Sequence, residues 1–170
     1  MRVLFLDFDG VLHPADVWLE ADGRMRLGES SPGHTLFEHA PLLADILAPH
    51  EDVKIVLSTS WVPGLGFKQA LENLPEGLAG RVVGATFDPL VHGKGYGDVA
   101  RGYQVQGDAQ RRKLTDWVVL DDDARNWPDE SLERLIQTDP QMGLASPSAI
   151  ERLQAWLEEA KASSGCGGGR

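Results

Sequence analysis

The chain has 170 residues, 42% of them apolar and 25% charged, which is typical of one globular domain. Acidic residues outnumber basic ones 26 to 16, and the net charge of −10 argues against a general nucleic-acid binder. No apolar run approaches the roughly 18 residues of a membrane span, and the N-terminus lacks the features of a signal peptide. We therefore expect a cytoplasmic protein that does not contact membranes.

Short apolar runs alternate with helical patterns along the chain. The runs predict strands at residues 3–6, 53–57, 81–87, 117–120 and 135–137, and the patterns predict helices at 41–47, 67–74, 98–112 and from 147 onward. Continuous apolar strands suit a parallel sheet that is buried on both faces. The alternation predicts a three-layer α/β fold, with helices on both faces of the sheet. We place the domain at 1–162 and a flexible Gly-rich tail, which includes Cys166, at 163–170.

Small polar clusters follow three of the predicted strands. These clusters are Asp7-Phe8-Asp9-Gly10, Ser58-Thr59-Ser60 and Asp121-Asp122-Asp123. In parallel α/β sheets, ligands bind beyond the carboxyl ends of the strands. The three clusters are therefore expected to meet in one cleft.

Gathered carboxylates repel one another, and a divalent cation relieves that repulsion. A cluster of oxygen ligands without Cys or His suits a hard ion, and Mg²⁺ is the usual choice for phosphate chemistry. Asp7 could then attack a phosphoryl group. Asp9 could protonate the leaving oxygen and later activate water, while Gly10 allows the backbone to bend between strand and cleft.

The segment Phe5-Leu6-Asp7-Phe8-Asp9-Gly10-Val11-Leu12 resembles the first motif of the haloacid dehalogenase (HAD) superfamily, whose members are mostly phosphatases. Ser58 is similar to the second motif, whose hydroxyl binds the phosphoryl group, and Val118-Val119-Leu120-Asp121-Asp122 to the fourth, acidic motif. The longer pattern, with His13, Trp61 and Thr138-Asp139 to Gly143, resembles the subgroup that includes HAD domains of RNA-repair proteins. The resemblance implies a Rossmann-like fold and an aspartyl-phosphate intermediate on Asp7.

The resemblance also assigns roles to further residues. Asp122 is expected to bind Mg²⁺ directly together with Asp7 and Asp9, and Asp121 is expected to act indirectly or through water. We expect the substrate to contact Ser58, Thr59, Gly10 and His13. The basic third motif has three candidates, Lys94, Arg101 and Lys113. Arg101 is favoured because Arg101-Gly102 resembles the subgroup's helix start, whereas Lys113 falls at the opposite edge of the sheet.

The interval between the first two motifs leaves room for a flap near residues 16–36 instead of a cap domain. A hairpin around Ala21-Asp22-Gly23 is expected there, with Trp18, Leu19, Met25 and Leu27 as apolar contacts. An open site suits a large phosphorylated substrate, such as a nucleotide, a nucleic-acid end or a protein, or a site that a partner protein completes. Two hypotheses remain: a Mg²⁺-dependent phosphomonoesterase, and a binding or regulatory module that keeps the HAD fold without useful turnover.

Overall fold

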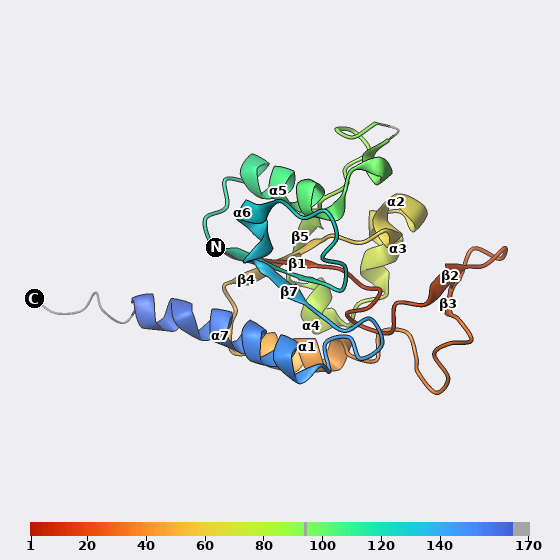
Figure 1. Cartoon of the computed structure of the whole chain (residues 1–170), viewed down its shortest axis with the longest axis horizontal. Coiled ribbons are helices and arrows are strands. Elements are labelled where there is room, and N and C mark those ends of the chain that lie inside the picture. The colour runs from red at the N-terminus through yellow and green to blue at the C-terminus, as the bar shows by residue number, and fades with distance from the viewer. Residues whose placement is uncertain (94, 165–170) are drawn as a thin grey trace, which may run out of the picture.

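The computed structural model describes residues 1–93 and 95–164 of the chain. Five parallel strands form its main sheet in the order β5-β4-β1-β6-β7 (Figure 1). The strands are β1 (Arg2–Leu6), β4 (Val53–Leu57), β5 (Val82–Ala85), β6 (Trp117–Asp121) and β7 (Leu135–Gln137). All five were predicted from apolar runs, and the predicted Rossmann-like α/β fold is confirmed.

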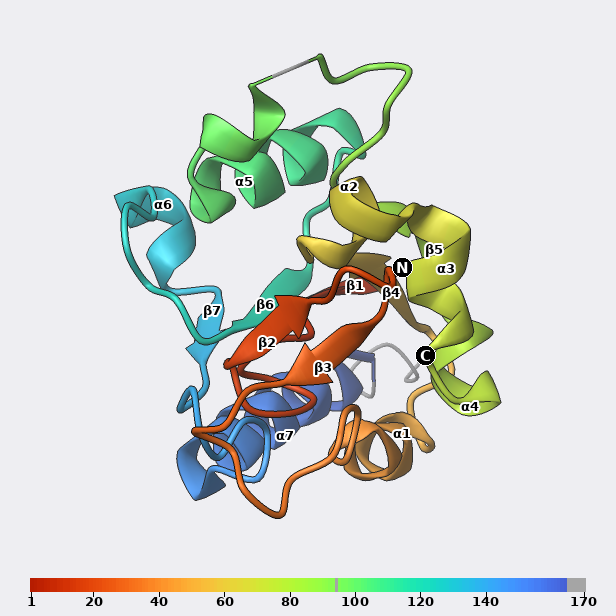
Figure 2. The same cartoon turned by 90° about the vertical axis from the view of Figure 1, so that its right-hand side faces the viewer.

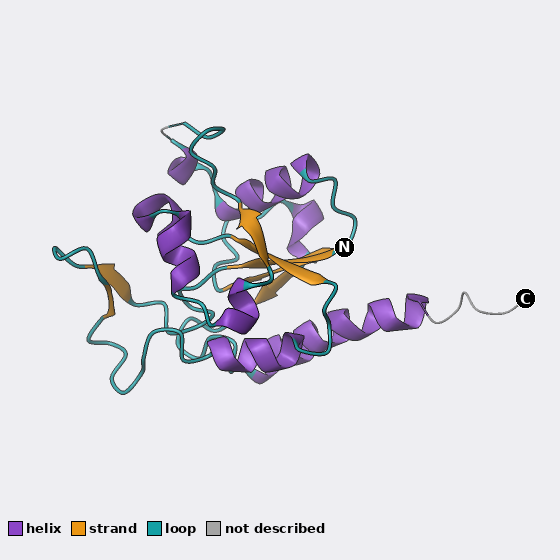
Figure 3. Cartoon of the chain, turned by 180° about the vertical axis from the view of Figure 1, so that it is seen from behind, coloured by secondary structure: helices purple, strands orange, loops and turns teal. Residues whose placement is uncertain are grey.

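Helices cover both faces of the sheet, as Figure 3 shows from behind. Phe5 of the central strand points to the face that is covered by α5 (Arg101–Arg111), where it packs with Val56, Val119, Val105 and Ala109. Leu6 points to the face that is covered by α1 (Ala40–Leu47) and α7 (Pro147–Ser164), where the cluster includes Leu57, Leu120, Leu43 and Leu153. This alternation follows from the two-residue period of a strand. It explains why the strands read as continuous apolar runs.

Four short helical segments escaped prediction. They are α2 (Trp61–Leu65), α4 (Glu76–Ala79), α6 (Asp129–Leu132) and the 3₁₀ turn η1 (Tyr96–Asp98), whereas α3 (Phe67–Glu72) lies within a predicted helix. Segments of three to five residues are too short for an apolar period to show. The edge strand β5 also differs from the prediction of burial on both faces, because Val83 is 46% exposed.

The predicted flap is an antiparallel hairpin of β2 (Val17–Leu19) and β3 (Met25–Leu27). It extends from the end of the sheet at which β1 terminates (Figures 1 and 2). Trp18 and Leu19 were expected to make apolar contacts, but they are 64% and 52% exposed. The indole of Trp18 instead donates a hydrogen bond to Asp16 Oδ1 at 2.6 Å, so a local polar contact holds a ring that the small hairpin cannot bury.

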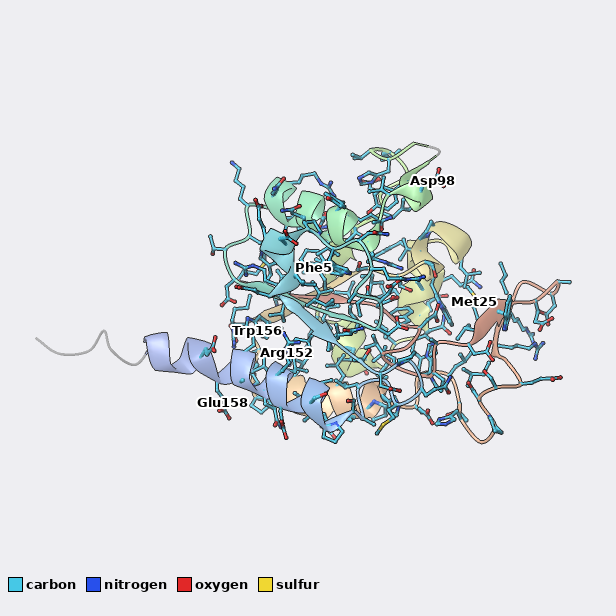
Figure 4. The ribbon with its side chains drawn as sticks, viewed as in Figure 1. Phe5, Met25, Asp98, Arg152, Trp156 and Glu158 are labelled. Atoms are coloured by element: carbon cyan, nitrogen blue, oxygen red, sulfur yellow. The ribbon has the colours of Figure 1, made fainter. Side chains whose placement is uncertain are left out.

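The last helix, α7, packs along the sheet and reaches residue 164, two residues into the segment predicted as a tail. Figure 4 shows Trp156 on this helix and Phe5 inside the domain. The indole of Trp156 lies 5.2 Å from the Arg2 guanidinium and donates to Asp116 Oδ1. Residues 165–170, with Cys166, lie outside the described residues. Among the helices that the structure describes, none is long and apolar enough to cross a membrane.

Candidate active site

The polar clusters that follow β1, β4 and β6 meet at one edge of the sheet, as predicted. β1 lies between the other two strands, so its final residue Leu6 is level with Leu57 and Leu120. The residues that follow these strands surround a cleft of about 440 Å³, which is lined by Asp7, Asp9, Ala15, Ser60, Arg101, Asp121, Asp122, Asp123 and Arg125. Of these, Ala15 and Arg125 were not expected in the cleft from the sequence.

Asp7 lies at the floor of this cleft and is 6% exposed. Its Oδ1 accepts a hydrogen bond from the backbone N–H of Phe8 at 2.7 Å, which leaves Oδ2 facing Arg101. Burial raises the pKa of Asp7 to about 6, although the positive charge of Arg101 opposes the rise. Asp7 therefore has one oxygen held by the backbone and the other turned toward a cation.

Two further carboxylates lie close to that of Asp7. Asp7, Asp121 and Asp122 each place an oxygen within 4.8 Å of the others. Burial raises the pKa of Asp122, and burial together with the charge of Asp7 raises that of Asp121 well above its usual value. Oδ2 of Asp121 is buried, and no group in the described part of the chain hydrogen-bonds to it. An oxygen-only group with an unsatisfied buried oxygen fits a hard divalent cation.

This group differs from the predicted ligand set in one member. Asp121 rather than Asp9 completes this close group of carboxylate oxygens, whereas Asp9 has other neighbours; Asp9 as a metal ligand stays a prediction. Its Oδ1 accepts hydrogen bonds from Trp61 Nε1 at 2.9 Å and lies 3.0 Å from His13 Nε2. The sequence indicated Trp61 only as part of the subgroup pattern, and its separation of 52 residues from Asp9 carries no local signal of this contact.

His13 is fully buried, with both ring nitrogens in contact with protein groups. It lies beneath Asp9 rather than in the lining of the cleft, so the structure does not place it where a substrate contact was expected. The reason is the turn after β1, which packs His13 against Phe37 and Trp61.

Gly10 is required by the close approach of two strand ends. Its φ of +71° is a conformation that favours glycine, and an added Cβ would lie 2.4 Å from the carboxyl carbon of Asp122. Its carbonyl accepts a hydrogen bond from Thr138 Oγ1 at 2.6 Å. Gly10 thus shapes the site through its backbone and brings Asp122 next to the turn after β1.

Arg101 opens α5 and reaches the centre of the cleft. Its Nη2 lies 3.7 Å from Asp7 Oδ2 and its Nε lies 3.8 Å from Asp121 Oδ2, while Nη1 donates to the carbonyl of Ser58. Burial disfavours the charge of Arg101, but attraction to Asp7 and Asp121 outweighs it and raises the pKa of Arg101. Among the described residues, Arg101 is therefore the basic group that pairs with Asp7.

Of the other two candidates for the basic third motif, the structure describes only Lys113. Lys113 follows the C-terminal end of α5, as expected, at the far end of the helix from the site. Lys94 lies outside the described residues. The helix start is further fixed by Gly102, since a Cβ there would lie 2.7 Å from Pro128.

Ser58 and Thr59 follow β4 and are both buried. The hydroxyl of Ser58 has no hydrogen-bond partner among the described residues, which makes it an unused donor. Thr59 faces a smaller neighbouring cavity of about 110 Å³, which it shares with Arg101, Tyr96 and Phe87. Neither residue lines the larger cleft, where Ser60 lies instead, so the contact of Ser58 with a phosphoryl group stays a prediction.

A family model described as the HAD domain in Swiss Army Knife RNA repair proteins matches residues 3–149. The chain belongs to this family. The match runs from β1 to the start of α7, so it contains every residue of the cleft described above. No curated protein matches the chain. Membership supports a hydrolase of the HAD type, and it agrees with the subgroup expected from His13, Trp61 and Thr138-Asp139.

Proposed function

We propose that this HAD domain is a Mg²⁺-dependent phosphomonoesterase in which Asp7 is the nucleophile. The observation that carries the proposal is the environment of Asp7, whose Oδ2 faces the guanidinium of Arg101 at 3.7 Å while Oδ1 is held by the Phe8 N–H. A buried carboxylate attacking a phosphate monoester needs nearby positive charge, because both reactants are anions. Arg101 supplies part of it.

In the first half of the reaction, Oδ2 of Asp7 forms a bond to phosphorus, and the bond from phosphorus to the leaving oxygen breaks. Asp9 gives its proton to that oxygen. In the second half, water attacks the phosphorus of the aspartyl phosphate and passes a proton to Asp9. The bond between phosphorus and Asp7 then breaks and releases inorganic phosphate, so both carboxyl groups return to their starting state.

Arg101 and Ser58 hold the phosphoryl group during both halves. The guanidinium offers planar donors that match phosphate oxygens, and the unpaired hydroxyl of Ser58 provides another donor. Mg²⁺, which Asp7, Asp121 and Asp122 would hold, supplies further neutralisation of negative charge when bound. Both ways of neutralising charge support an enzyme over a module that only binds.

For the substrate, we propose a phosphate at the end of a polynucleotide. The name of the matched family refers to RNA repair, and the cleft is bordered by a small hairpin rather than a cap domain. Arg125, which is 86% exposed in its side chain and pairs with Asp123, adds a second guanidinium to the cleft wall. The net charge of −10 limits general attraction to nucleic acid, which favours recognition of the terminal phosphate itself.

The proposal is tested by hydrolysis of an aryl phosphate and of RNA oligonucleotides with a 3′- or 5′-terminal phosphate. We expect Mg²⁺-dependent release of phosphate by the wild type and no release by Asp7→Asn. Activity that survives Asp7→Asn would contradict the nucleophile. Turnover of aryl phosphate without turnover of either oligonucleotide would contradict the proposed polynucleotide substrate, but not the proposed phosphatase mechanism.

A further inference from the structure

The two carboxylate oxygens of Asp9 have unequal surroundings. Oδ1 is 2.9 Å from the indole nitrogen of Trp61 and 3.0 Å from Nε2 of His13. Trp61 and His13 are almost completely buried, whereas the Asp9 side chain is 26% exposed and lines the cleft. The buried side of Asp9 is therefore Oδ1, and the side open to the cleft is Oδ2.

The hydrogen on His13 can be located from its other neighbour. The backbone N–H of Phe37 donates to His13 Nδ1 at 3.1 Å, so Nδ1 is an acceptor and carries no hydrogen. A neutral imidazole then has its hydrogen on Nε2. His13 accordingly donates to Asp9, and Oδ1 accepts from two N–H groups.

An oxygen that accepts two such hydrogen bonds is a poor place for a proton, because both donors point their hydrogens at it. Any proton that Asp9 carries must therefore sit on Oδ2. We propose that His13 and Trp61 are positioning residues that hold Asp9 by Oδ1 and reserve Oδ2 for proton transfer with the leaving oxygen and with water. This inference rests on the proposed phosphatase function, to which it adds the atom that carries the proton.

The same contacts connect Asp9 to the flap. Phe37 lies just beyond the hairpin segment and has a φ of +61°, which is unusual for a residue with a large side chain. Its ring packs edge to face against Phe8, His13 and Trp61, with centroids 4.9 to 5.2 Å away. Packing of this aromatic cluster holds the Phe37 N–H toward His13. The returning end of the flap therefore sets the tautomer of the residue that holds Asp9.

The first experiment reads the His13 tautomer directly in the full chain. A long-range ¹H–¹⁵N NMR spectrum of the metal-free protein at neutral pH reports which ring nitrogen carries hydrogen. We expect hydrogen on Nε2 and none on Nδ1. Hydrogen on Nδ1, in either the neutral or the charged ring, would overturn the inference without bearing on whether the protein is a phosphatase.

The second experiment compares leaving groups. Departure of an alkoxide needs a proton far more than departure of p-nitrophenolate, so a misplaced acid harms alkyl phosphates most. Trp61→Phe removes the indole N–H, together with part of a buried ring, and we expect kcat/KM for glycerol phosphate to fall on the order of tenfold more than kcat/KM for p-nitrophenyl phosphate. Trp156→Phe is the matched control, because it removes an indole donor to Asp116 and should leave both rates unchanged.

His13 is tested in the same way. His13→Gln keeps a donor that can reach Asp9 and should retain more activity on glycerol phosphate than His13→Leu, relative to p-nitrophenyl phosphate. Equal losses on both substrates in Trp61→Phe indicate a purely structural role and overturn the inference, while the proposed function stands. A wild type that hydrolyses neither these two substrates nor the phosphorylated oligonucleotides contradicts the proposed function, and the inference falls with it.

Discussion

Nη2 of Arg101 lies 3.7 Å from Oδ2 of Asp7, where the first turn of α5 meets the residue that follows β1. The same guanidinium approaches Asp121 and donates to the carbonyl of Ser58. One side chain thereby joins the ends of β1, β4 and β6. Its charge lies where a phosphate and an attacking carboxylate would otherwise repel each other, so the loss of Arg101 should lower kcat/KM.

Arg101→Met is expected to lower kcat/KM for an aryl phosphate by about 10²–10³-fold, the usual cost of removing one group that stabilises developing charge. Arg101→Lys should recover part of the loss, because it restores the charge but not the planar donors. Steady-state kinetics of the three proteins checks this. Lys113→Met removes a charge beyond the far end of α5 and is expected to behave as wild type; full activity in Arg101→Met would contradict the role.

Ser58→Ala separates ligand binding from stability. Its hydroxyl is buried and has no partner among the described residues, so its removal should leave the free energy of unfolding unchanged or slightly raised. The affinity for inorganic phosphate should fall on the order of 10- to 100-fold, as expected for one lost hydrogen bond to a charged group. Denaturant unfolding and calorimetric titration measure the two effects.

Ser131→Ala is the control for Ser58→Ala, since Ser131 Oγ is likewise buried and without a described partner but lies outside the cleft. It should alter neither phosphate affinity nor stability by much. Phosphate affinity that is equal in Ser58→Ala and wild type would show that the hydroxyl does not contact the phosphoryl group.

Mg²⁺ should stabilise the folded protein, because it binds the native cluster and not the unfolded chain. We expect the Tm of the wild type to rise with Mg²⁺ concentration and the Tm of Asp122→Asn to respond weakly. Asp123→Asn removes the same charge one residue later, from a side chain that is paired with Arg125, and should respond like wild type. Equal responses of all three proteins would place the ion elsewhere.

The metal-free protein should lose stability as the pH rises from about 4 to above 6. Burial raises the pKa of Asp7 to about 6, so the folded state binds more protons than the unfolded state in this window. A shift of this size corresponds to about 3 kcal/mol. Asp7→Asn cannot ionise and should be less sensitive to pH, and the difference between the two unfolding curves isolates this residue. Parallel curves would mean that Asp7 ionises normally.

Much of the site could be predicted because local patterns encode it. Apolar runs end at Asp7, Ser58 and Asp121, and parallel strands bring such ends to one edge of a sheet. The order of the strands does not change this, so their convergence needed no knowledge of the topology. The start of α5 at Arg101 was likewise predicted from its resemblance to the subgroup's helix start.

The contacts of Asp9 could not be predicted in this way. They depend on how the turn after β1 packs against α2 and on where the chain comes back from the flap at Phe37. Neither contact produces a repeating pattern of apolar residues in the sequence. The exposure of Trp18 was missed for a similar reason, because an apolar residue indicates burial only when enough chain surrounds it. Three residues per strand leave the hairpin too small for that.

The most direct test of Asp7 as the nucleophile is to trap the phosphoryl group on it. Asp9→Asn should still react with p-nitrophenyl phosphate, whose leaving group needs no proton, but should hydrolyse the intermediate slowly because it lacks the base for water. Acid quenching with Mg²⁺ present, followed by mass spectrometry, is expected to find the phosphoryl group on Asp7. Phosphoryl transfer to another residue, or hydrolysis with no phosphorylated Asp7 at any time, would contradict the proposed mechanism.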